Sequence, residues 1–149
     1  MKIRFASILI SLSLLAGCVS YGLSLPNGIS VREVAGGKIL TNEAGLTLYV
    51  FDLDLPGISN CYQDCATNWP PAYAADGAEA KGDFSMIPRK DGRNQWAYKE
   101  QPLYLFIKDK KPGDINGDGV RNVWYIVTMS SKDDSGQKST EEGGYSSGY

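Results

Sequence analysis

The chain carries the same seven-residue motif twice. Residues 48–54 read Leu-Tyr-Val-Phe-Asp-Leu-Asp and residues 103–109 read Leu-Tyr-Leu-Phe-Ile-Lys-Asp, so both copies follow the pattern Leu-Tyr-x-Phe-x-x-Asp, 55 positions apart. A comparison of 28–75 with 83–130 at this offset gives seven identities in 48 positions, and four of them fall inside the motif. Because an internal repeat decides how the rest of a sequence is divided, we interpret the chain as two copies of one building block.

Each copy has the sequence pattern of a three-stranded antiparallel meander. Alternating apolar and β-branched residues predict the strands, and Gly-Gly at 36–37 and Asp-Gly at 91–92 mark the hairpin turns. The predicted strands are 29–35, 38–42 and 46–52 in the first copy, 83–90, 93–99 and 103–107 in the second, and a final apolar strand at 124–129. The sequence therefore predicts a mainly β protein with a single domain of two tandem repeats, 29–75 and 83–130.

The first 17 residues have the parts of an export signal. Two basic residues precede an apolar stretch at 5–15, which is too short to cross a bilayer as a helix. The following Leu-Ala-Gly-Cys at 15–18 resembles a bacterial lipobox, and this resemblance implies that Cys18 becomes a lipid-modified N-terminus. Val19, where an Asp would signal retention in the inner membrane, favours the outer membrane. An ordinary signal peptide with an incidental cysteine is the alternative.

The rest of the chain divides into three regions. Residues 18–28 form a short lipid-anchored tether, and 29–130 form the β-rich domain. Residues 131–149 are rich in Ser, Gly and charge and contain no aliphatic side chain, so we expect a disordered acidic tail. Without the two basic residues of the signal, 13 of the 15 Lys and Arg residues stand against 17 Asp and Glu, a net charge of −4. With no basic run, a nucleic-acid partner is not expected.

The chain has three cysteines, of which Cys61 and Cys65 remain once Cys18 is assigned to lipid. A cysteine pair in an exported protein indicates a disulfide. A redox-active pair is the alternative, but the spacing is not Cys-x-x-Cys, and no helix N-terminus or neighbouring Lys clearly lowers a thiol pKa. Residues 65–71 read Cys-Ala-Thr-Asn-Trp-Pro-Pro and predict a short helical turn in the disulfide loop, which the prolines end.

The chain contains no histidine. Ser-His-Asp and Cys-His nucleophiles, zinc hydrolases with His ligands and His-ligated haem are therefore excluded. We expect a protein that is not an enzyme and that has no resident cofactor, with calcium as the one candidate.

The repeat motif supplies the candidate site residues. The Tyr and Phe of each copy share one strand face, because side chains alternate along a strand, and aromatic burial favours a core in which the two copies meet across a pseudo-twofold axis. The Asp after each strand is expected to accept backbone N–H groups in a turn, with a carboxylate pair for acid–base chemistry as the alternative. With the repeated tryptophan, the residues are Tyr49, Phe51, Asp54, Trp69, Tyr104, Phe106, Asp109 and Trp124.

A second candidate site lies after the second motif. Asp114, Asn116 and Asp118, followed by a Gly, match the first half of an EF-hand-type calcium loop. The twelfth position of that loop is Tyr125 rather than the bidentate Glu, and Asp109 is a carboxylate that could complete the site. The alternative is a tight turn, for which Asp, Asn and Gly are equally suited.

The order of these motifs resembles the family described as secreted repeat of unknown function, predicted bacterial lipoproteins with a Tyr-x-aromatic-x-x-Asp motif. The resemblance covers about residues 29–129 and includes the cysteine loop, the Trp-Pro-Pro at 69–71 and the Pro-Gly-Asp at 112–114. It implies an extracytoplasmic domain of tandem repeats and implies no activity. One departure is Lys-Glu-Gln at 99–101, where a Gly commonly precedes Pro-Leu-Tyr, so this turn is expected to have a different shape.

The sequence thus predicts an exported lipoprotein of the bacterial envelope that is attached through Cys18 to the membrane, which Val19 indicates is the outer one. Its expected role is that of a non-catalytic structural or ligand-binding module with an unidentified protein or small-molecule partner. One alternative is a redox or electron-transfer accessory that uses exposed aromatic residues or the cysteine pair. The other is a calcium-stabilised binding domain. The loops after the two motifs, 55–71 and 110–123, differ between the copies and are the expected place of any specific function.

Overall fold

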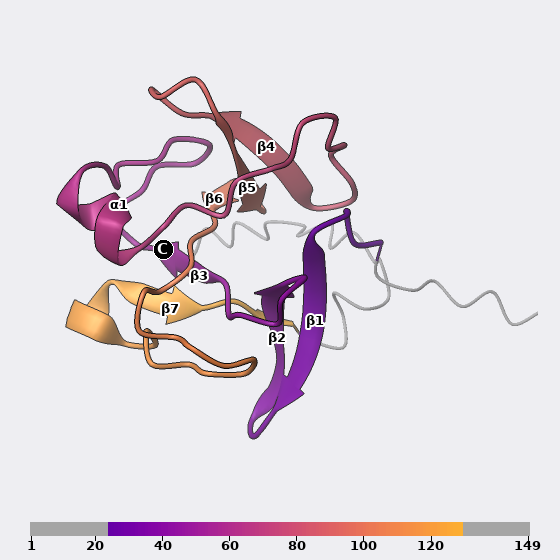
Figure 1. Ribbon diagram of the computed structural model, residues 1–149, viewed down its shortest axis with the longest axis vertical. Helices are drawn as coiled ribbons and strands as arrows, with labels where there is room; N and C mark the ends of the chain where they lie inside the picture. Colours follow the sequence, from indigo (N-terminus) through magenta and orange to yellow (C-terminus); the bar gives the residue numbers. More distant parts are fainter. Residues whose placement is uncertain (1–23, 130–149) are drawn as a thin grey trace, which may run out of the picture.

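The computed structural model describes residues 24–129. Within this range the chain is mainly β, as the sequence predicts, with one short helix beside the disulfide (Figure 1). The strands are β1 (Ile29–Val34), β2 (Gly37–Asn42), β3 (Tyr49–Phe51), β4 (Phe84–Pro88), β5 (Asn94–Tyr98), β6 (Gln101–Pro102), β7 (Trp124–Ile126) and β8 (Thr128–Met129), and the helical segments are α1 (Asp64–Asn68) and the 3-10 turn η1 (Val120–Asn122).

Each repeat begins with an antiparallel hairpin. β1 pairs with β2 from Ile29 opposite Asn42 to Val34 opposite Gly37. β4 pairs with β5 from Phe84 opposite Tyr98. The two hairpins confirm the first two predicted strands of each copy. They lie on opposite sides of the molecule, with β3 between them (Figure 1).

The last part of the second repeat completes the first repeat. β7 pairs with β3, and β8 pairs with β2. Between them, Val127 accepts a bond from the Leu40 N–H at 3.0 Å and donates to the Leu48 carbonyl at 3.3 Å. The Leu48 N–H also donates directly to the Leu40 carbonyl at 3.0 Å, so the chain end of the second copy joins β2 and β3 where these two strands diverge.

The first repeat returns the same contribution to the second. Ala72, 55 positions before Val127, accepts a bond from the Trp96 N–H at 2.8 Å and donates to the Leu103 carbonyl at 2.9 Å. The segment after each repeated tryptophan thus pairs with the other copy. The sequence predicted two meanders, and this reciprocal exchange of their last segments is a feature that it did not reveal.

The two copies meet at the repeated tyrosine. The Tyr49 N–H donates to the Tyr104 carbonyl at 2.8 Å, and the Tyr104 N–H donates to the Tyr49 carbonyl at 2.9 Å. Because each residue pairs with its own repeat equivalent, a pseudo-twofold axis passes through this antiparallel bridge.

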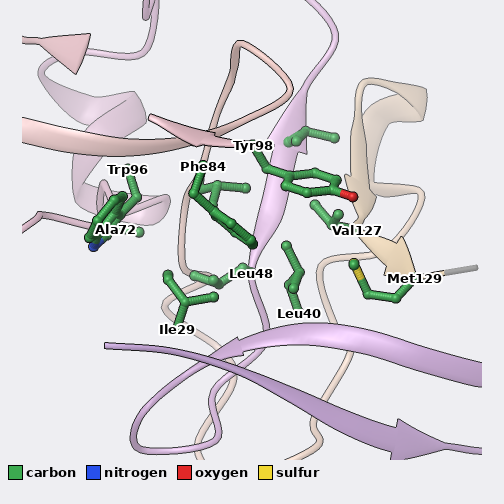
Figure 2. Close-up of a cluster of buried hydrophobic side chains, with 11 residues drawn as sticks. Ile29, Leu40, Leu48, Ala72, Phe84, Trp96, Tyr98, Val127 and Met129 are labelled. Carbon is green, nitrogen blue, oxygen red and sulfur yellow. The ribbon is translucent and has the colours of Figure 1, made fainter. Parts of the chain in front are cut away.

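A hydrophobic core on one side of this bridge is built from both copies (Figure 2). Leu40 and Leu48 of the first copy and Leu103 of the second are fully buried in it. The remaining buried members are Ile29, Val50, Ala72, Phe84, Trp96, Tyr98, Val127 and Met129. Since neither copy supplies this core alone, the exchange of segments and the burial of apolar area depend on each other.

The second motif departs from the predicted strand at 103–107. Only Tyr104 forms ladder bridges, while Leu105 donates to the Pro70 carbonyl and Ile107 donates to the carbonyl of Asn68, the last residue of α1. The turn at 99–101 has a different shape, as the sequence predicts: β5 and β6 are joined by Lys99 and Glu100, whose φ values are both positive, 47° and 65°. Two such residues form the mirror-image turn that suits a two-residue hairpin. This difference follows from the missing glycine noted in the sequence.

Several predicted regions lie outside the described residues. These are the signal at 1–17, the lipid-modified Cys18 with the start of the tether, and the tail at 131–149. Within 24–129, no helix has the length and apolar character needed to cross a membrane.

We predict that Glu100→Gly stabilises the protein. A non-glycine residue in the left-handed region costs about 1–2 kcal/mol, which exceeds the backbone-entropy cost of glycine of about 0.5–1 kcal/mol. The bond from the Gly57 N–H to the carbonyl of residue 100 uses only backbone and is retained. We expect the free energy of unfolding in urea to rise by about 0.5 kcal/mol.

The matched control is Glu79→Gly, at an exposed loop residue without a positive φ. It should leave the free energy of unfolding unchanged or lower it. Equal effects of the two substitutions would contradict the strain assigned to Glu100.

Candidate functional site

The tyrosine of each motif is bound to the aspartate of the other motif. The Tyr49 hydroxyl donates to Asp109 Oδ2 at 2.6 Å, and the Tyr104 hydroxyl donates to Asp54 Oδ2 at 2.6 Å. Both tyrosines are fully buried. The spacing of Tyr and Asp in the motif is therefore explained by two bonds that cross the pseudo-twofold axis and tie the copies together.

The second oxygen of each carboxylate organises the loop that follows. Asp54 Oδ1 accepts the N–H of Asn60 at 2.7 Å. Asp109 Oδ1 accepts the backbone N–H and the side-chain amide of Asn116, both at 3.0 Å. Both carboxylates thus accept backbone N–H groups, the role that the sequence favoured over an acid–base pair.

Burial sets the protonation chemistry of these groups. It raises the pKa of the Tyr49 and Tyr104 phenols far above the usual value, and the hydrogen bonds to Asp109 and Asp54 raise them further. Both hydroxyls therefore stay protonated and act as donors. Burial also raises the pKa of the Asp54 carboxyl, although its bonds from Tyr104 and Asn60 act in the opposite direction.

Four aromatic rings form a continuous stack beside the tyrosines. The Phe51 and Trp124 rings are 4.2 Å apart at 13°, the Trp124 and Trp69 rings 3.8 Å apart at 2°, and the Trp69 and Phe106 rings 4.1 Å apart at 21°. The order Phe–Trp–Trp–Phe repeats the pseudo-twofold symmetry, since the two tryptophans stack on each other at its centre. We call these four residues the aromatic stack.

The tyrosines pack edge-on against this stack. The Tyr49 ring lies 5.4 Å from that of Trp69, and the Tyr104 ring lies 5.2 Å from that of Trp124, both nearly perpendicular. Gly117 closes one side, because a Cβ there would come within 2.8 Å of both the Trp69 and Tyr49 rings. Its N–H also donates to the Tyr49 hydroxyl at 3.2 Å.

The predicted disulfide between Cys61 and Cys65 is confirmed. Cys61 is fully buried and packs in the same cluster as the tyrosines and tryptophans. The Cys65 carbonyl accepts the N–H of Trp69 at 2.8 Å at the end of α1. The disulfide loop therefore holds one tryptophan of the aromatic stack in place.

A buried arginine extends the site in a way that the sequence did not indicate. Arg89 Nη1 donates to Ser59 Oγ at 2.7 Å and to Gln95 Oε1 at 2.6 Å, and Nη2 donates to the Cys61 carbonyl at 2.7 Å. Ser59 in turn shares a hydrogen bond of 2.7 Å with the Tyr104 hydroxyl. Arg89 is 5% exposed. Its neighbours in sequence are a proline and a lysine, which indicate a solvent-facing strand end and gave no signal for burial.

The candidate calcium residues each have a structural partner. Asp114 accepts the N–H groups of Lys110 and Lys111 at 2.9 and 3.0 Å, and these bonds lower the pKa of its carboxyl. Asp118 accepts the N–H of Ile126 at 3.0 Å. The third residue, Asn116, is bound to Asp109 as described. Among residues 24–129 there is no group of three His, Cys, Asp or Glu side chains suited to hold a metal.

The eight motif residues thus lie together in one cluster, but most of them are buried from solvent. Tyr49, Tyr104 and Trp124 are at most 3% exposed, and Trp69 and Phe106 are at most 9% exposed. Phe51 and Asp54 are half-buried. A substrate cannot reach the centre of this cluster, so its geometry is that of a clamp between the two copies.

Residues 30–73 and 85–128 each match the family described as secreted repeat of unknown function. The two matches cover more than half of the chain and coincide with the two copies. The protein therefore belongs to this family of secreted tandem-repeat proteins. No curated protein matches it, and no solved structure matches it.

We predict that Tyr104 and Asp54 are energetically coupled. Tyr104→Phe and Asp54→Ala should each lower the free energy of unfolding by about 1–3 kcal/mol, because each leaves a buried polar partner unsatisfied. The double variant should lose less than the sum, by about 1–2 kcal/mol, in urea unfolding.

The control combines Tyr49→Phe with Asp54→Ala, two residues of the same motif that do not bond to each other. Their effects should add within about 0.5 kcal/mol. Additivity of Tyr104 with Asp54, or coupling within one motif only, would contradict the crossed arrangement.

Proposed function

We propose that the protein is a lipid-anchored envelope protein that works as a non-catalytic structural or ligand-binding module. The observation that supports this best is that the side chains of the family motif are buried and contact one another, so that they stabilise the fold. Its tyrosines, aspartates and tryptophans bond to or stack on one another, so the motif marks a scaffold. Specific recognition then belongs to the surfaces and loops around it.

The chemistry of the accessible groups supports a role without catalysis. The chain has no histidine, and both cysteines of the described range are joined to each other. Ser59 is buried and bonded to Arg89 and Tyr104, so no base is positioned to activate it for attack on a substrate. Asp54 and Asp109 are each bonded to a different tyrosine and a different loop.

Membrane attachment is proposed from the Leu-Ala-Gly-Cys at 15–18. A diacylated or triacylated Cys18 would bind a bilayer stably, since several acyl chains together bury many CH₂ groups at about 0.8 kcal/mol each. Leu25 already packs against the core, so few residues separate it from the lipid and the domain would stay close to the membrane surface. We propose the outer membrane because the residue after Cys18 is Val19 and not the Asp that would signal retention in the inner membrane.

We predict that Cys18→Ser releases the protein from the membrane. The wild type should sediment with the outer membrane and require detergent for extraction, whereas Cys18→Ser should be recovered mainly in the soluble exported fraction. Density-gradient fractionation with immunoblotting measures this.

The matched variant Val19→Asp keeps the lipid and should move the protein from the outer to the inner membrane. If Cys18→Ser remained as firmly bound as the wild type, the proposed lipid anchor would be wrong.

As a second candidate, we propose one-electron transfer through the buried aromatic residues. The rings of Tyr49, Trp69, Trp124 and Tyr104 follow one another at 5.4, 3.8 and 5.2 Å. Each tyrosine hydroxyl is bonded to a carboxylate. An external one-electron oxidant would take an electron from a tyrosine through the tryptophans, while the phenolic proton moves to the bonded carboxylate.

This second candidate predicts a tyrosyl radical at the buried pair. Electron paramagnetic resonance after photo-oxidation with a soluble one-electron oxidant should detect it in the wild type and in Tyr125→Phe, which removes an exposed ring. The signal should disappear in Tyr49→Phe/Tyr104→Phe. A radical that persists in this double variant and is lost in Tyr125→Phe would contradict the candidate.

A further inference from the structure

The loop after the first motif exposes three aliphatic side chains. Leu53, Leu55 and Ile58 are 61%, 56% and 54% exposed, more than any other large hydrophobic residue of the described chain. Residues 55–63 contain no charged side chain. Single apolar residues are normal on a protein surface, whereas several that lie together indicate an interaction. We call residues 53–58 the apolar loop.

Main-chain bonds hold the apolar loop in one shape. The Leu55 N–H donates to the Ile58 carbonyl at 3.1 Å, and the Ile58 N–H donates to the Leu55 carbonyl at 2.9 Å. The Asn60 side-chain amide donates to the Leu53 carbonyl at 2.7 Å. None of these bonds involves an aliphatic side chain, so the loop backbone is fixed while the three side chains remain at the surface.

The second repeat shows that the clamp does not need these aliphatic residues. The positions that correspond to them, 55 places later in the chain, carry two lysines and a glycine, Lys108, Lys110 and Gly113. Asp109 of this copy nevertheless forms its crossed bond with Tyr49. Because the fold is made without aliphatic residues at these positions, their presence in the first repeat has another purpose.

A short path of contacts connects the apolar loop to the start of the described chain. Ser24 lies beside Gly82, since a Cβ there would come within 3.7 Å of the Ser24 carbonyl oxygen. The next residue, Asp83, accepts the Lys99 N–H at 2.9 Å, and the residue after Lys99 accepts the Gly57 N–H at 2.7 Å. Five steps of about 5 Å, each a peptide unit or a contact, place Ser24 within about 25 Å of the loop.

The tether is long enough to bring Cys18 and the apolar loop to one surface. Ser24 follows Cys18 by six positions, and an extended chain spans about 3.3–3.6 Å per residue, so the tether reaches about 20 Å. This reach is comparable to the span from Ser24 to the loop. A lipid on Cys18 would therefore allow the loop to contact the bilayer that holds the lipid.

We propose that the apolar loop inserts into the surface of the membrane to which Cys18 is attached. This contact rests on the membrane attachment proposed above and adds a second point of attachment. Insertion removes the apolar area of Leu53, Leu55 and Ile58 from water, and no charged side chain of 55–63 enters the bilayer with them. Membrane binding grows with buried apolar area, so a small loop contributes.

A protein partner or a second copy fits the apolar loop less well. A stable interface takes about 800 Å² and about 20–30 residues from each partner, whereas the loop offers three aliphatic side chains. Asp52 and Glu100, which flank the loop, are exposed and charged, so the apolar surface does not extend past it. A bilayer needs no complementary shape, because its acyl chains rearrange around the side chains that enter.

The test attaches the mature chain to a bilayer in a defined way. The thiol of Cys18, in chain made without lipid, is coupled to a maleimide lipid in phosphatidylcholine nanodiscs, while the other two cysteines stay in their disulfide. Methyl signals are then recorded by nuclear magnetic resonance with and without a lipid that carries a nitroxide near the top of its acyl chain. We expect the nitroxide to broaden the Ile58 signal about threefold more than those of Ile107 and Ile115, which a surface-inserted loop requires.

Ile107 and Ile115 are exposed aliphatic residues in and after the second motif, and they also supply the control variant. Leu55→Ser/Ile58→Ser should reduce the broadening of the Leu53 methyl signals to the level of Ile115. Ile107→Ser/Ile115→Ser removes the same number of exposed aliphatic side chains and should leave the broadening at the apolar loop unchanged. Unshifted core methyl signals verify that each variant is folded.

Equal broadening at Ile58 and Ile115, or none at either, would overturn the proposal. It would also be overturned if the chain without lipid sedimented as a dimer that Leu55→Ser/Ile58→Ser converts to a monomer, because a second copy would then cover the loop. Both results differ from failure of the natural anchor, because maleimide coupling does not depend on lipidation in the cell, which fractionation of Cys18→Ser measures.

Discussion

The hydrogen bond between the tyrosine of one repeat and the aspartate of the other is the interaction on which the rest of the structure depends. It occurs twice, at 2.6 Å each time, on either side of the Tyr49–Tyr104 bridge. Each aspartate also shapes the loop after its own motif, so one carboxylate links the position of a loop to the position of the opposite repeat. A phenol and a carboxylate are both costly to bury alone, and each satisfies the other here. The motif therefore requires two copies, which accounts for its presence twice in this chain.

The two halves of the clamp are not equivalent in their electrostatics. Around Tyr104 and Asp54, the Arg89 charge stabilises the carboxylate and lowers its pKa, although burial raises it more. The position equivalent to Arg89 in the first repeat is Val34, so the Tyr49–Asp109 pair lacks this cation and relies on the amide of Asn116 and the N–H of Gly117. The duplicated backbone arrangement is thus stabilised by different chemistry in each half. This is how two copies with few identical residues keep the same crossed bonds.

Local patterns in the sequence were sufficient for the hairpins, the disulfide and the grouping of the motif residues. Alternation and glycine turns locate β1, β2, β4 and β5, and cysteine parity identifies the pair. The exchange of the segments around Ala72 and Val127 could not be predicted, because an apolar run shows that a strand is buried but not which strand it joins. The burial of Arg89 could not be predicted for a similar reason. Two of its partners, Ser59 and Cys61, lie 28 or more positions away in the sequence, and only Gln95 is nearby. The crossed bonds could not be predicted either, because they depend on the pseudo-twofold relation between the two copies, which is seen only in the three-dimensional structure.

Because the exchange is reciprocal, neither repeat is a folding unit of its own. The first copy alone lacks the partner that Val127 provides to Leu40 and Leu48, and the second alone lacks the partner that Ala72 provides to Trp96 and Leu103. The motif residues therefore serve the assembly of the two copies, and this role does not depend on which ligand or partner the protein binds. Differences in ligand or partner between such proteins must arise from residues that the clamp leaves free. In this chain those residues lie in the loops after the motifs and in the segment that joins the two repeats.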